Sequence, residues 1–392
     1  MSRAPSHALP DTLPAGLPGT PPSHSADKAS RIAAMTLGLC LPADTLLYLI
    51  LPLYSEAFGV TIAQAGLLLA ANRLVRIFGY SHVVRFYARR GDRPVCLLAA
   101  GTAAVCALGY ATLTGFWWLL PIRLAWGLSF AALNLSTQVL STADPQGAAR
   151  RTGRSRAVIS MGPALALPLG AVLCHWWGPR AIFFLLFLTA VGGVFVARAL
   201  PAVQHPMPAA GGRRWRWPDS LAVWSFVEGV VLDGLFIFGL ALHAQTVRPH
   251  SAVLVAGALL ALRYISELTL SPLGGQAAHR WGAVRMLVIF SLLTSVALVG
   301  FGFDWLLVGG ACVMLLRAMQ LTLVAPVVAL RNPGLARLPA LAGNAMWRDL
   351  GAGTGPLIAG LLLPVASAAT VYAVAGVALA ASALATGFSQ KG

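Results

Sequence analysis

The stretch Ala43-Asp44-Thr45-Leu46-Leu47-Tyr48 places a carboxylate near the middle of an apolar run that extends from Ile32 to Leu53. A run of this length can cross a bilayer as a single helix. A charge at the centre of such a helix costs several kcal/mol unless it faces a partner or a water-filled cavity. Asp44 is therefore a candidate functional residue. The alternative is a protonated or paired carboxyl group that only holds two helices together.

The composition of the chain indicates a polytopic membrane protein. Its 392 residues are 58% hydrophobic and only 10% charged, which is more apolar than a soluble domain of this length requires. The net charge of +16 could indicate a nucleic-acid-binding protein, but the basic residues lie in short loops between apolar runs. We therefore expect no nucleic-acid partner and interpret the positive charge as a signal of membrane orientation.

The cysteine pattern does not suggest a metal site. The five cysteines are scattered through the apolar runs, and no CxxC or Cys/His spacing occurs in the sequence. A disulfide framework or a zinc site would require such spacings. We expect neither of them, and we expect no cofactor.

Loop signals divide the chain into twelve apolar segments, each long enough to span a bilayer. We predict an all-α membrane protein with twelve transmembrane helices in two pseudo-symmetric six-helix bundles. The segments run approximately over residues 32–54, 64–86, 94–115, 117–140, 156–176, 180–200, 219–243, 251–274, 283–303, 305–330, 338–363 and 367–387.

The charges of the connecting loops predict the orientation. If the N-terminal tail is cytoplasmic, nearly all the loop Lys and Arg residues lie on the cytoplasmic side, and only Arg180 and Arg248 lie on the other. Such an excess predicts that both termini are cytoplasmic, which requires an even number of spans. We expect a monomeric, multi-pass protein of the bacterial inner membrane.

A polar interruption between the sixth and seventh segments divides the chain into two halves. We predict a disordered cytoplasmic tail (1–31), an N-terminal six-helix bundle (32–200), a cytoplasmic central loop (201–218) and a C-terminal six-helix bundle (219–388). The halves repeat one another at a spacing of about 190 residues, as in many transporters. The corresponding residues are Asp44 and Asp233, Arg73 and Arg263, Arg123 and Arg317, and Gly162-Pro163 and Gly355-Pro356.

Two six-span halves joined by a basic loop resemble the major facilitator superfamily, and local motifs support the match over residues 32–388. One motif is the family's loop signature GxLADRxGRK, which Gly275-Gln-Ala-Ala-His279-Arg280-Trp-Gly282 resembles, with His in place of Asp. The copy after the second segment is degraded to Arg89-Arg90-Gly91-Asp92-Arg93. The resemblance implies that these are gate loops, with Gly91, Asp92, Arg93, Gly275, Arg280 and Gly282 as the candidate residues.

Two further motifs carry the same resemblance. Arg123-Leu-Ala-Trp126-Gly127 looks like the family's RxxQGxGxA, with Trp in place of Gln, and Arg317-Ala-Met-Gln320 retains the Gln. The Gly-Pro pairs of the fifth and eleventh segments, Gly162-Pro163 and Gly355-Pro356, resemble a motif that is commonest in the antiporter branches. Gly351 and Gly355 also form a GxxxG pair, for which close helix packing is the alternative role.

The resemblance implies that segments 1, 4, 7 and 10 surround a central cavity. Asp44 and Asp233 lie in the middle of segments 1 and 7, and Arg123 and Arg317 lie in segments 4 and 10. Each charge alone would be costly in the membrane, so we predict two pairs, Asp44 with Arg123 and Asp233 with Arg317. An Asp released from its Arg by substrate could exchange a proton, which makes these four residues the candidates for proton coupling.

Other polar residues in the segments are candidates for the substrate cavity. Arg73 and Arg76 share one helix face and could bind a carboxylate or phosphate, or instead pair with Asp44 or reach toward the interface. Arg263 and Glu267 are spaced to pair within one helix, which favours a structural role. The candidate cavity residues are Tyr48, Arg73, Arg76, Glu228, Gln320, Arg348 and Asp349.

Two of these expectations depend on helix geometry. Glu228 precedes Asp233 by five residues, and in an α-helix it should point well away from it as a second titratable site. Arg348 and Asp349 are adjacent, so they could satisfy each other or line the cavity wall.

These features predict a secondary active transporter that alternates access to a site at the membrane midplane. The sequence contains no Walker motif, so an ion gradient, most simply of protons, should supply the energy. We expect proton-coupled export by antiport of a small organic anion such as a drug-like compound, a siderophore or an organic acid. The alternatives are uptake by proton symport and, remotely, an integral membrane enzyme. The expected anionic cargo rests on six arginines (73, 76, 123, 263, 317 and 348) against five acids (44, 228, 233, 267 and 349) in the segments.

Overall fold

The computed structural model describes residues 23–202 and 218–389, and within these ranges every regular element is a helix. The apolar runs of the sequence become long helices because a helix satisfies its backbone hydrogen bonds internally in a lipid environment. The N-terminal half contains α1 (Ser23–Leu53), α2 (Ile62–Arg90), α3 (Asp92–Thr112), α4 (Phe116–Ser141), α5 (Ala148–Trp177) and α6 (Ile182–Ala197).

In the C-terminal half, one long segment is built from three consecutive elements, α7 (Ser220–Glu228), the π-helix η2 (Gly229–Phe236) and α8 (Ile237–Val247). Another segment consists of α11 (Leu306–Gln320) and α12 (Val324–Arg331). When each of these segments is taken as one span, the described residues contain the twelve predicted segments in the predicted order. The remaining helices are α9 (Ala252–Trp281), α10 (Ala283–Gly302), α13 (Arg337–Leu362) and α14 (Ala368–Phe388).

Within the described residues, nine segments are long and apolar enough to cross a membrane. Helix α6 is strongly apolar but has only 16 residues. Helices α9 and α13 are of spanning length and carry several of the charged side chains described below. These nine segments, together with α6, α9 and α13, have the lengths and apolar character of a multi-pass membrane protein.

Helix α1 begins earlier than the sequence predicts. The expected tail extends to residue 31, but the helix is already formed at Ser23. Ala26 and Ser30 are buried there, and the Ser30 hydroxyl lies 2.8 Å from that of Ser155 on α5. The polar residues before the apolar run therefore continue the helix and pack against α5. Residues 1–22 and most of the predicted central loop lie outside the described residues.

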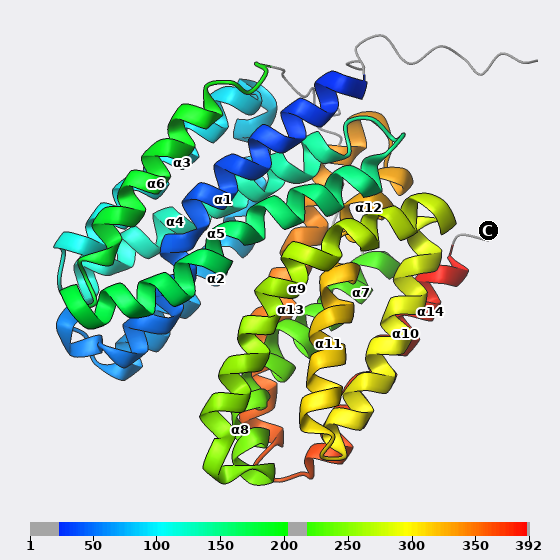
Figure 1. Cartoon of the computed structure of the whole chain (residues 1–392). Coiled ribbons are helices and arrows are strands. Elements are labelled where there is room, and N and C mark those ends of the chain that lie inside the picture. Colours follow the sequence, from blue (N-terminus) through cyan, green and yellow to red (C-terminus); the bar gives the residue numbers. More distant parts are fainter. Residues whose placement is uncertain (1–22, 203–217, 390–392) are drawn as a thin grey trace, which may run out of the picture.

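The helices form two groups that lie side by side (Figure 1). Within the N-terminal group, α1 packs against α5 and α6, and α2 packs against α4. Within the C-terminal group, α10 packs against α11 and α14, and α13 packs against the π-helix. The two groups meet mainly along two helix pairs, α5 with α9 and α2 with α13.

Glycines permit close approach of backbones within both halves. A Cβ atom on Gly162 would lie 2.1 Å from the Gly38 carbonyl oxygen, and one on Gly351 would lie 2.1 Å from that of Phe226. A Cβ atom on Gly355 would lie 2.5 Å from Cα of Gly234. At these positions the helices pack as closely as the glycines of the sequence predict. The neighbouring Pro163 and Pro356 lie inside α5 and α13 without ending either helix.

Candidate functional site

A buried ion pair joins α1 to α4 in the N-terminal half. The Arg123 guanidinium donates a hydrogen bond through Nη1 to Oδ1 of Asp44, as the sequence predicts. Arg123 is fully buried, and 9% of Asp44 is exposed. Nδ2 of Asn72 donates to the same carboxylate oxygen at 3.3 Å, and Nε of Arg123 donates to the Leu68 carbonyl oxygen at 3.2 Å. The ring centroid of Tyr48 lies 5.4 Å from the Arg123 guanidinium carbon. Tyr48, which the sequence predicts in the substrate cavity, therefore lies beside the ion pair.

The corresponding residues of the C-terminal half also pair, but with additional partners. Nε of Arg317 donates to Oδ1 of Asp233 at 3.1 Å, and its Nη1 donates to Oε1 of Glu267 at 2.7 Å. Nη2 of Arg348 donates to the other carboxylate oxygen of Asp233. Arg263 adds a third cation, with Nη2 3.9 Å from Oδ1 of Asp233. Asp233 is therefore surrounded by three guanidinium groups.

The expected intrahelical pair of Arg263 and Glu267 is present, but it is not isolated. Nε of Arg263 lies 3.5 Å from Oε1 of Glu267, which also accepts the shorter bond from Arg317. Oε2 of Glu267 accepts a hydrogen bond from Ser160 on α5 at 3.0 Å. The predicted pair is therefore present, and Glu267 also bonds to both halves of the protein.

Glu228 lies on the same side as Asp233, contrary to the sequence prediction. Nε of Arg348 donates to Oε2 of Glu228 at 3.0 Å while its Nη2 contacts Asp233. The cause is the π-helix that begins at Gly229, because its wider turn brings residues five apart onto one face. No residue pattern that we recognise identifies this turn in the sequence.

The adjacent residues Arg348 and Asp349 point toward different partners. Arg348 remains within the C-terminal half, whereas Oδ1 of Asp349 lies 3.2 Å from Nη1 of Arg76 on α2. Tyr80 donates a second hydrogen bond to Asp349 at 3.0 Å. Arg76 thus pairs across the two halves and not with Asp44. Arg73 also crosses between the halves by donating to the carbonyl oxygen of Ala352.

Arg156 is a site residue that the sequence analysis missed. The fifth predicted segment starts at this residue, where the charge pattern predicts a cation on the cytoplasmic side, but α5 begins eight residues earlier, at Ala148. Its guanidinium interacts electrostatically with Glu267, Asp233, Arg317 and Arg348. Among the described residues it has no hydrogen-bond or ion-pair partner. A helix start at residue 148 would have been the signal that places this cation in a span.

Gln320 does not lie where the sequence predicts. Its side chain is fully buried, and Nε2 donates to the Phe290 carbonyl oxygen at 2.9 Å and to the Thr294 hydroxyl at 2.6 Å. Both partners belong to α10, so Gln320 bonds α11 to α10 instead of lining a cavity. The retained Gln of the motif has a packing role in this half.

The candidate gate residues divide into loop and helix positions. Gly91 separates α2 from α3 with a φ angle of 78°, and Gly282 separates α9 from α10 with a φ angle of 89°. Gly275, predicted in a loop, lies inside α9, where a Cβ atom would be 2.4 Å from the Ala149 carbonyl oxygen of α5. This glycine therefore permits close packing between the halves.

The charged gate candidates differ in their exposure and contacts. Asp92 is buried at the start of α3 and accepts a hydrogen bond from the Tyr87 hydroxyl. Nε of Arg93 donates to the Leu200 carbonyl oxygen at 2.7 Å. Arg280 is exposed in the last turn of α9. A gating role for these residues stays a prediction.

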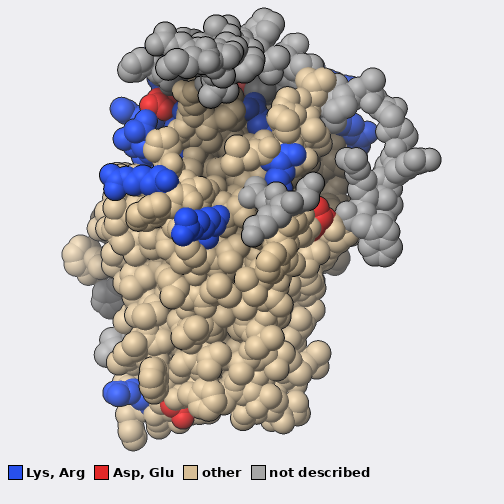
Figure 2. Space-filling model, turned by 90° about the vertical axis from the view of Figure 1, so that its right-hand side faces the viewer, with Lys and Arg blue, Asp and Glu red and all other residues tan. Residues whose placement is uncertain are grey.

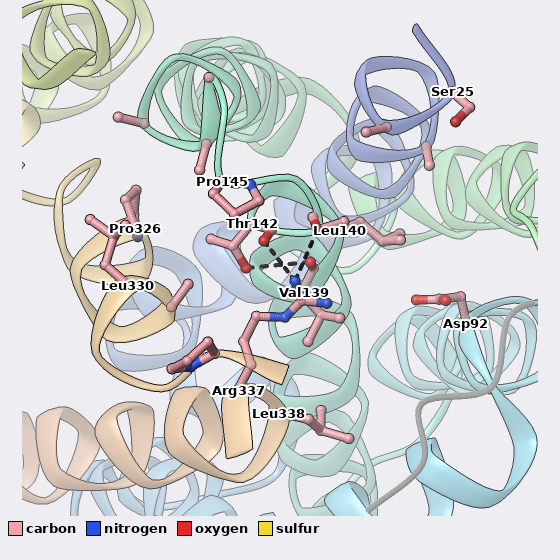
Figure 3. A pocket seen from close by; sticks show the side chains of 18 of the residues that line it. Ser25, Asp92, Val139, Leu140, Thr142, Pro145, Pro326, Leu330, Arg337 and Leu338 are labelled. Atoms are coloured by element: carbon pink, nitrogen blue, oxygen red, sulfur yellow. Dashed lines mark hydrogen bonds between the residues drawn. The ribbon is translucent and has the colours of Figure 1, made fainter. Parts of the chain in front are cut away.

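A cavity of about 1050 Å³ lies at one end of the molecule and is lined by residues of both halves. Nη1 of Arg337 donates to the carbonyl oxygens of Thr142 and Ala143, at 2.7 and 3.1 Å, and so bridges α13 to the residues that follow α4 (Figure 3). We call this end the basic end. It holds the starts of α1, α3 and α5, and Lys and Arg side chains gather near one end of the face in Figure 2. The ion-pair residues do not line this cavity.

The site is built from buried guanidinium and carboxylate groups. Among residues 23–202 and 218–389, no three His, Cys, Asp or Glu side chains are grouped so that they could hold a metal ion. Buried guanidinium and carboxylate groups can bind a charged solute or exchange a proton.

Comparison with known proteins agrees with this arrangement. The family model of the Major Facilitator Superfamily matches residues 33–247. The uncharacterized MFS-type transporter YhhS of Escherichia coli O157:H7 is 26% identical over 367 residues, which cover 87% of this chain and 85% of that protein. The inner membrane transport protein YnfM of Escherichia coli K12 is 26% identical over 252 residues, which cover 59% of each protein.

Two solved structures share the fold. The human organic anion transporter MFSD10 (TETRAN) superimposes with a TM-score of 0.78 at 17% identity and covers 92% of this chain and 99% of that one. The proton:xylose symporter XylE superimposes with a TM-score of 0.75 at 13% identity and covers 92% and 95%. These likenesses confirm the predicted twelve-helix fold.

Proposed function

The chain belongs to the Major Facilitator Superfamily, and on that premise we propose that it couples proton movement to the transport of a small organic anion. As a member of this family it is a multi-pass membrane transport protein. The observation that carries the proposal is the buried pair of Asp44 and Arg123, a lone acid and a lone cation in contact between α1 and α4. An ionisable pair inside a membrane span is a functional site by default because its burial is costly.

We propose the bacterial inner membrane as its location, with both termini in the cytoplasm. The support is the distribution of charge, because Lys and Arg gather at the basic end in Figure 2. Cytoplasmic loops carry this excess in membrane proteins. The proposed units are the two six-helix halves expected from the sequence, residues 32–200 and 219–388. Rocking of one group against the other would alternate access to the charged site.

An excess of guanidinium groups supports an anionic cargo. With Arg156, the two charged clusters and the contacts between the halves contain seven arginines (73, 76, 123, 156, 263, 317 and 348) against five acids (44, 228, 233, 267 and 349). Arg156 has no hydrogen-bond or ion-pair partner among the described residues, so its guanidinium group could bind a carboxylate, sulfonate or phosphate. The fold neighbour MFSD10 carries the name of an organic anion transporter, which is consistent with this choice.

Asp44 is the preferred proton carrier, with Asp233 as the second candidate. Movement of Arg123 away from Asp44 would leave a carboxyl group in a low-dielectric site, where the neutral form is favoured. Asp233 would have to lose several cations at once to reach the same state. We favour export by antiport because the Gly-Pro pairs of α5 and α13 resemble those of antiporters. Uptake by symport is the alternative.

The test is proton movement in proteoliposomes loaded with a pH dye and with a panel of organic anions that includes sulfanilate. Efflux of a transported anion should acidify the lumen in antiport and make it more alkaline in symport. The neutral amide sulfanilamide, matched in shape, should produce no change. Collapse of the pH gradient should abolish uphill transport, and transport that continues unchanged would contradict proton coupling.

Two variants assign the residues in the same assay. Asp44→Asn should abolish the pH change, and Arg156→Gln should raise the KM for the anion at least about tenfold, since a charged hydrogen bond contributes about 1.5 to 3 kcal/mol. Glu56→Gln and Arg150→Gln change exposed residues outside the charge network and should behave as the unaltered protein. An Asp44→Asn variant with full proton movement would show that the carrier lies elsewhere.

A further inference from the structure

A second cavity, of about 770 Å³, lies at the basic end where α1 and α5 meet α9. It is lined by Lys28, Arg31 and Met35 of α1, by Arg154 and Val158 of α5, and by Pro272 of α9, among others. Lys28, Arg31 and Arg154 are exposed, and 38% of Met35 is exposed. The cavity is therefore a surface groove between helices, and it is separate from the charge network inside the spans.

The charge of this groove is strongly positive. Its one acid, Asp27, lies 3.5 Å from Nη1 of Arg151, which is buried and also pairs with Asp144. The acid is therefore already paired within the protein. Lys28, Arg31 and Arg154 have no ion-pair or hydrogen-bond partner in the described part of the chain. Three cations thus remain available to an anion from outside the protein.

The groove changes from charged to apolar along the helices. The cations lie within the first nine residues of α1 and the first seven of α5, near the ends of candidate membrane spans that begin at Ser25 and Ala148. Further along the same helices, the lining consists of Ile32, Met35, Ala157 and Val158. A ligand that fills the groove must carry negative charge at the membrane surface and a hydrocarbon chain below it.

From this order of charge and hydrocarbon we propose that the groove binds an acidic phospholipid. The phosphate would lie among Lys28, Arg31 and Arg154, and an acyl chain would follow Met35 and Val158 into the bilayer. Basic pockets between membrane helices are known to select anionic headgroups by this charge complementarity. A free phosphate would use the cations but would leave the apolar half of the groove unfilled.

The groove joins the two halves of the protein. Pro272 belongs to α9 of the C-terminal half, and the other lining residues belong to α1 and α5. Beside it the α5 and α9 backbones are close, because a Cβ atom on Gly153 would lie 2.5 Å from the Ser271 carbonyl oxygen. A phospholipid in the groove would therefore contact both halves where they are packed together and would stabilise this arrangement.

The experiment compares lipid retention of the full chain by native mass spectrometry after reconstitution with phosphatidylglycerol or with phosphatidylcholine. We expect phosphatidylglycerol to remain bound and phosphatidylcholine to be lost. The combined substitutions Lys28→Gln, Arg31→Gln and Arg154→Gln should weaken phosphatidylglycerol binding by roughly a hundredfold, from the usual contribution of each cation near an anionic surface. The control combines Arg89→Gln, Arg90→Gln and Arg280→Gln, which remove three exposed cations of the same end outside the groove.

Equal loss of phosphatidylglycerol in both variants would overturn the proposal, because it would indicate a general surface charge effect. Unchanged binding in the groove variant would overturn it as well. A second variant, Met35→Trp, fills the apolar part and leaves the charges in place, so it should also reduce retention. Competition by millimolar inorganic phosphate should fail, and success would identify a phosphate site in place of a lipid site. None of these outcomes depends on proton coupling or on the transported anion.

Discussion

The two halves of the protein place an aspartate and an arginine at corresponding positions, but they surround these residues differently. Asp44 accepts hydrogen bonds from one guanidinium and one amide, from Arg123 and Asn72. Asp233 contacts the guanidinium groups of Arg317 and Arg348 and lies 3.9 Å from that of Arg263. An acid with one cationic partner can be released by one movement. An acid with three partners is anchored, which is why the proposed proton exchange is placed in the N-terminal half.

The difference arises from two additional acids in the C-terminal half. Glu228 precedes Asp233 by five residues, and the position five residues before Asp44 is Leu39. Glu267 follows Arg263 by four residues, and the position four residues after Arg73 is Ile77. The N-terminal half thus has apolar residues where the C-terminal half has carboxylates. Each added acid requires further cations because an unpaired buried charge is unfavourable.

The two main contacts between the halves carry opposite charges at corresponding positions of α13 and α5. Asp349 lies seven residues before Pro356 on α13, and Arg156 lies seven residues before Pro163 on α5. Asp349 pairs with Arg76 of α2, whereas Arg156 interacts at longer range with Glu267 of α9. One contact is therefore closed by an ion pair, and the other retains a cation that is available to an anion.

The largest effect is expected from a substitution that breaks the ion pairs around Asp233 and Glu267. Arg317→Gln removes two ion pairs and leaves Asp233 and Glu267 short of cations, so it should destabilise the fold by about 3 to 5 kcal/mol. Arg123→Gln leaves only one acid, which can take up a proton, so its effect should be about half as large. Thermal and urea unfolding in the same detergent compare the two variants. Equal destabilisation would contradict the contrast between the halves.

A smaller effect tests whether packing, unlike charge, is equivalent in the two halves. Gly162→Val and Gly351→Val each place a side chain against a backbone carbonyl and should each cost about 1 to 3 kcal/mol. Gly343→Val on α13 is the matched control, since a Cβ atom at Gly343 meets nothing within 4 Å. The melting temperature of purified protein provides the measurement. A large effect at only one of the two glycines would show that the halves differ in packing as well.

The smallest effects are expected from two substitutions that each weaken one of the two main contacts between the halves. Tyr80→Phe removes a donor to Asp349, and Ser160→Ala removes a donor to Glu267. Each acid keeps an arginine partner, so each change should cost only about 1 kcal/mol. We expect faster hydrogen exchange in α2 and α13 for the first variant and in α5 and α9 for the second. Exchange that rises across the whole molecule would indicate unfolding in place of local opening.

Much of the architecture was predictable from the residues alone. Twelve apolar runs predict twelve spans because a bilayer fixes the length of a helix that crosses it. The contacts of Asp44 with Arg123 and of Asp233 with Arg317 were also predictable. The repeat puts the charges at matching positions, and the membrane makes an unpaired charge costly.

Only the tertiary structure decided how the remaining charges are shared. The π-helix after Glu228 changes the face on which that acid lies, and the early start of α5 places Arg156 inside a helix and not at its end. Arg348 and Asp349 separate because α13 lies between the π-helix and α2. The physical reason is that hydropathy predicts which residues lie within a membrane span, but not which side of the helix they occupy. The phase of the helix and the choice of neighbours depend on packing between segments that are far apart in the chain.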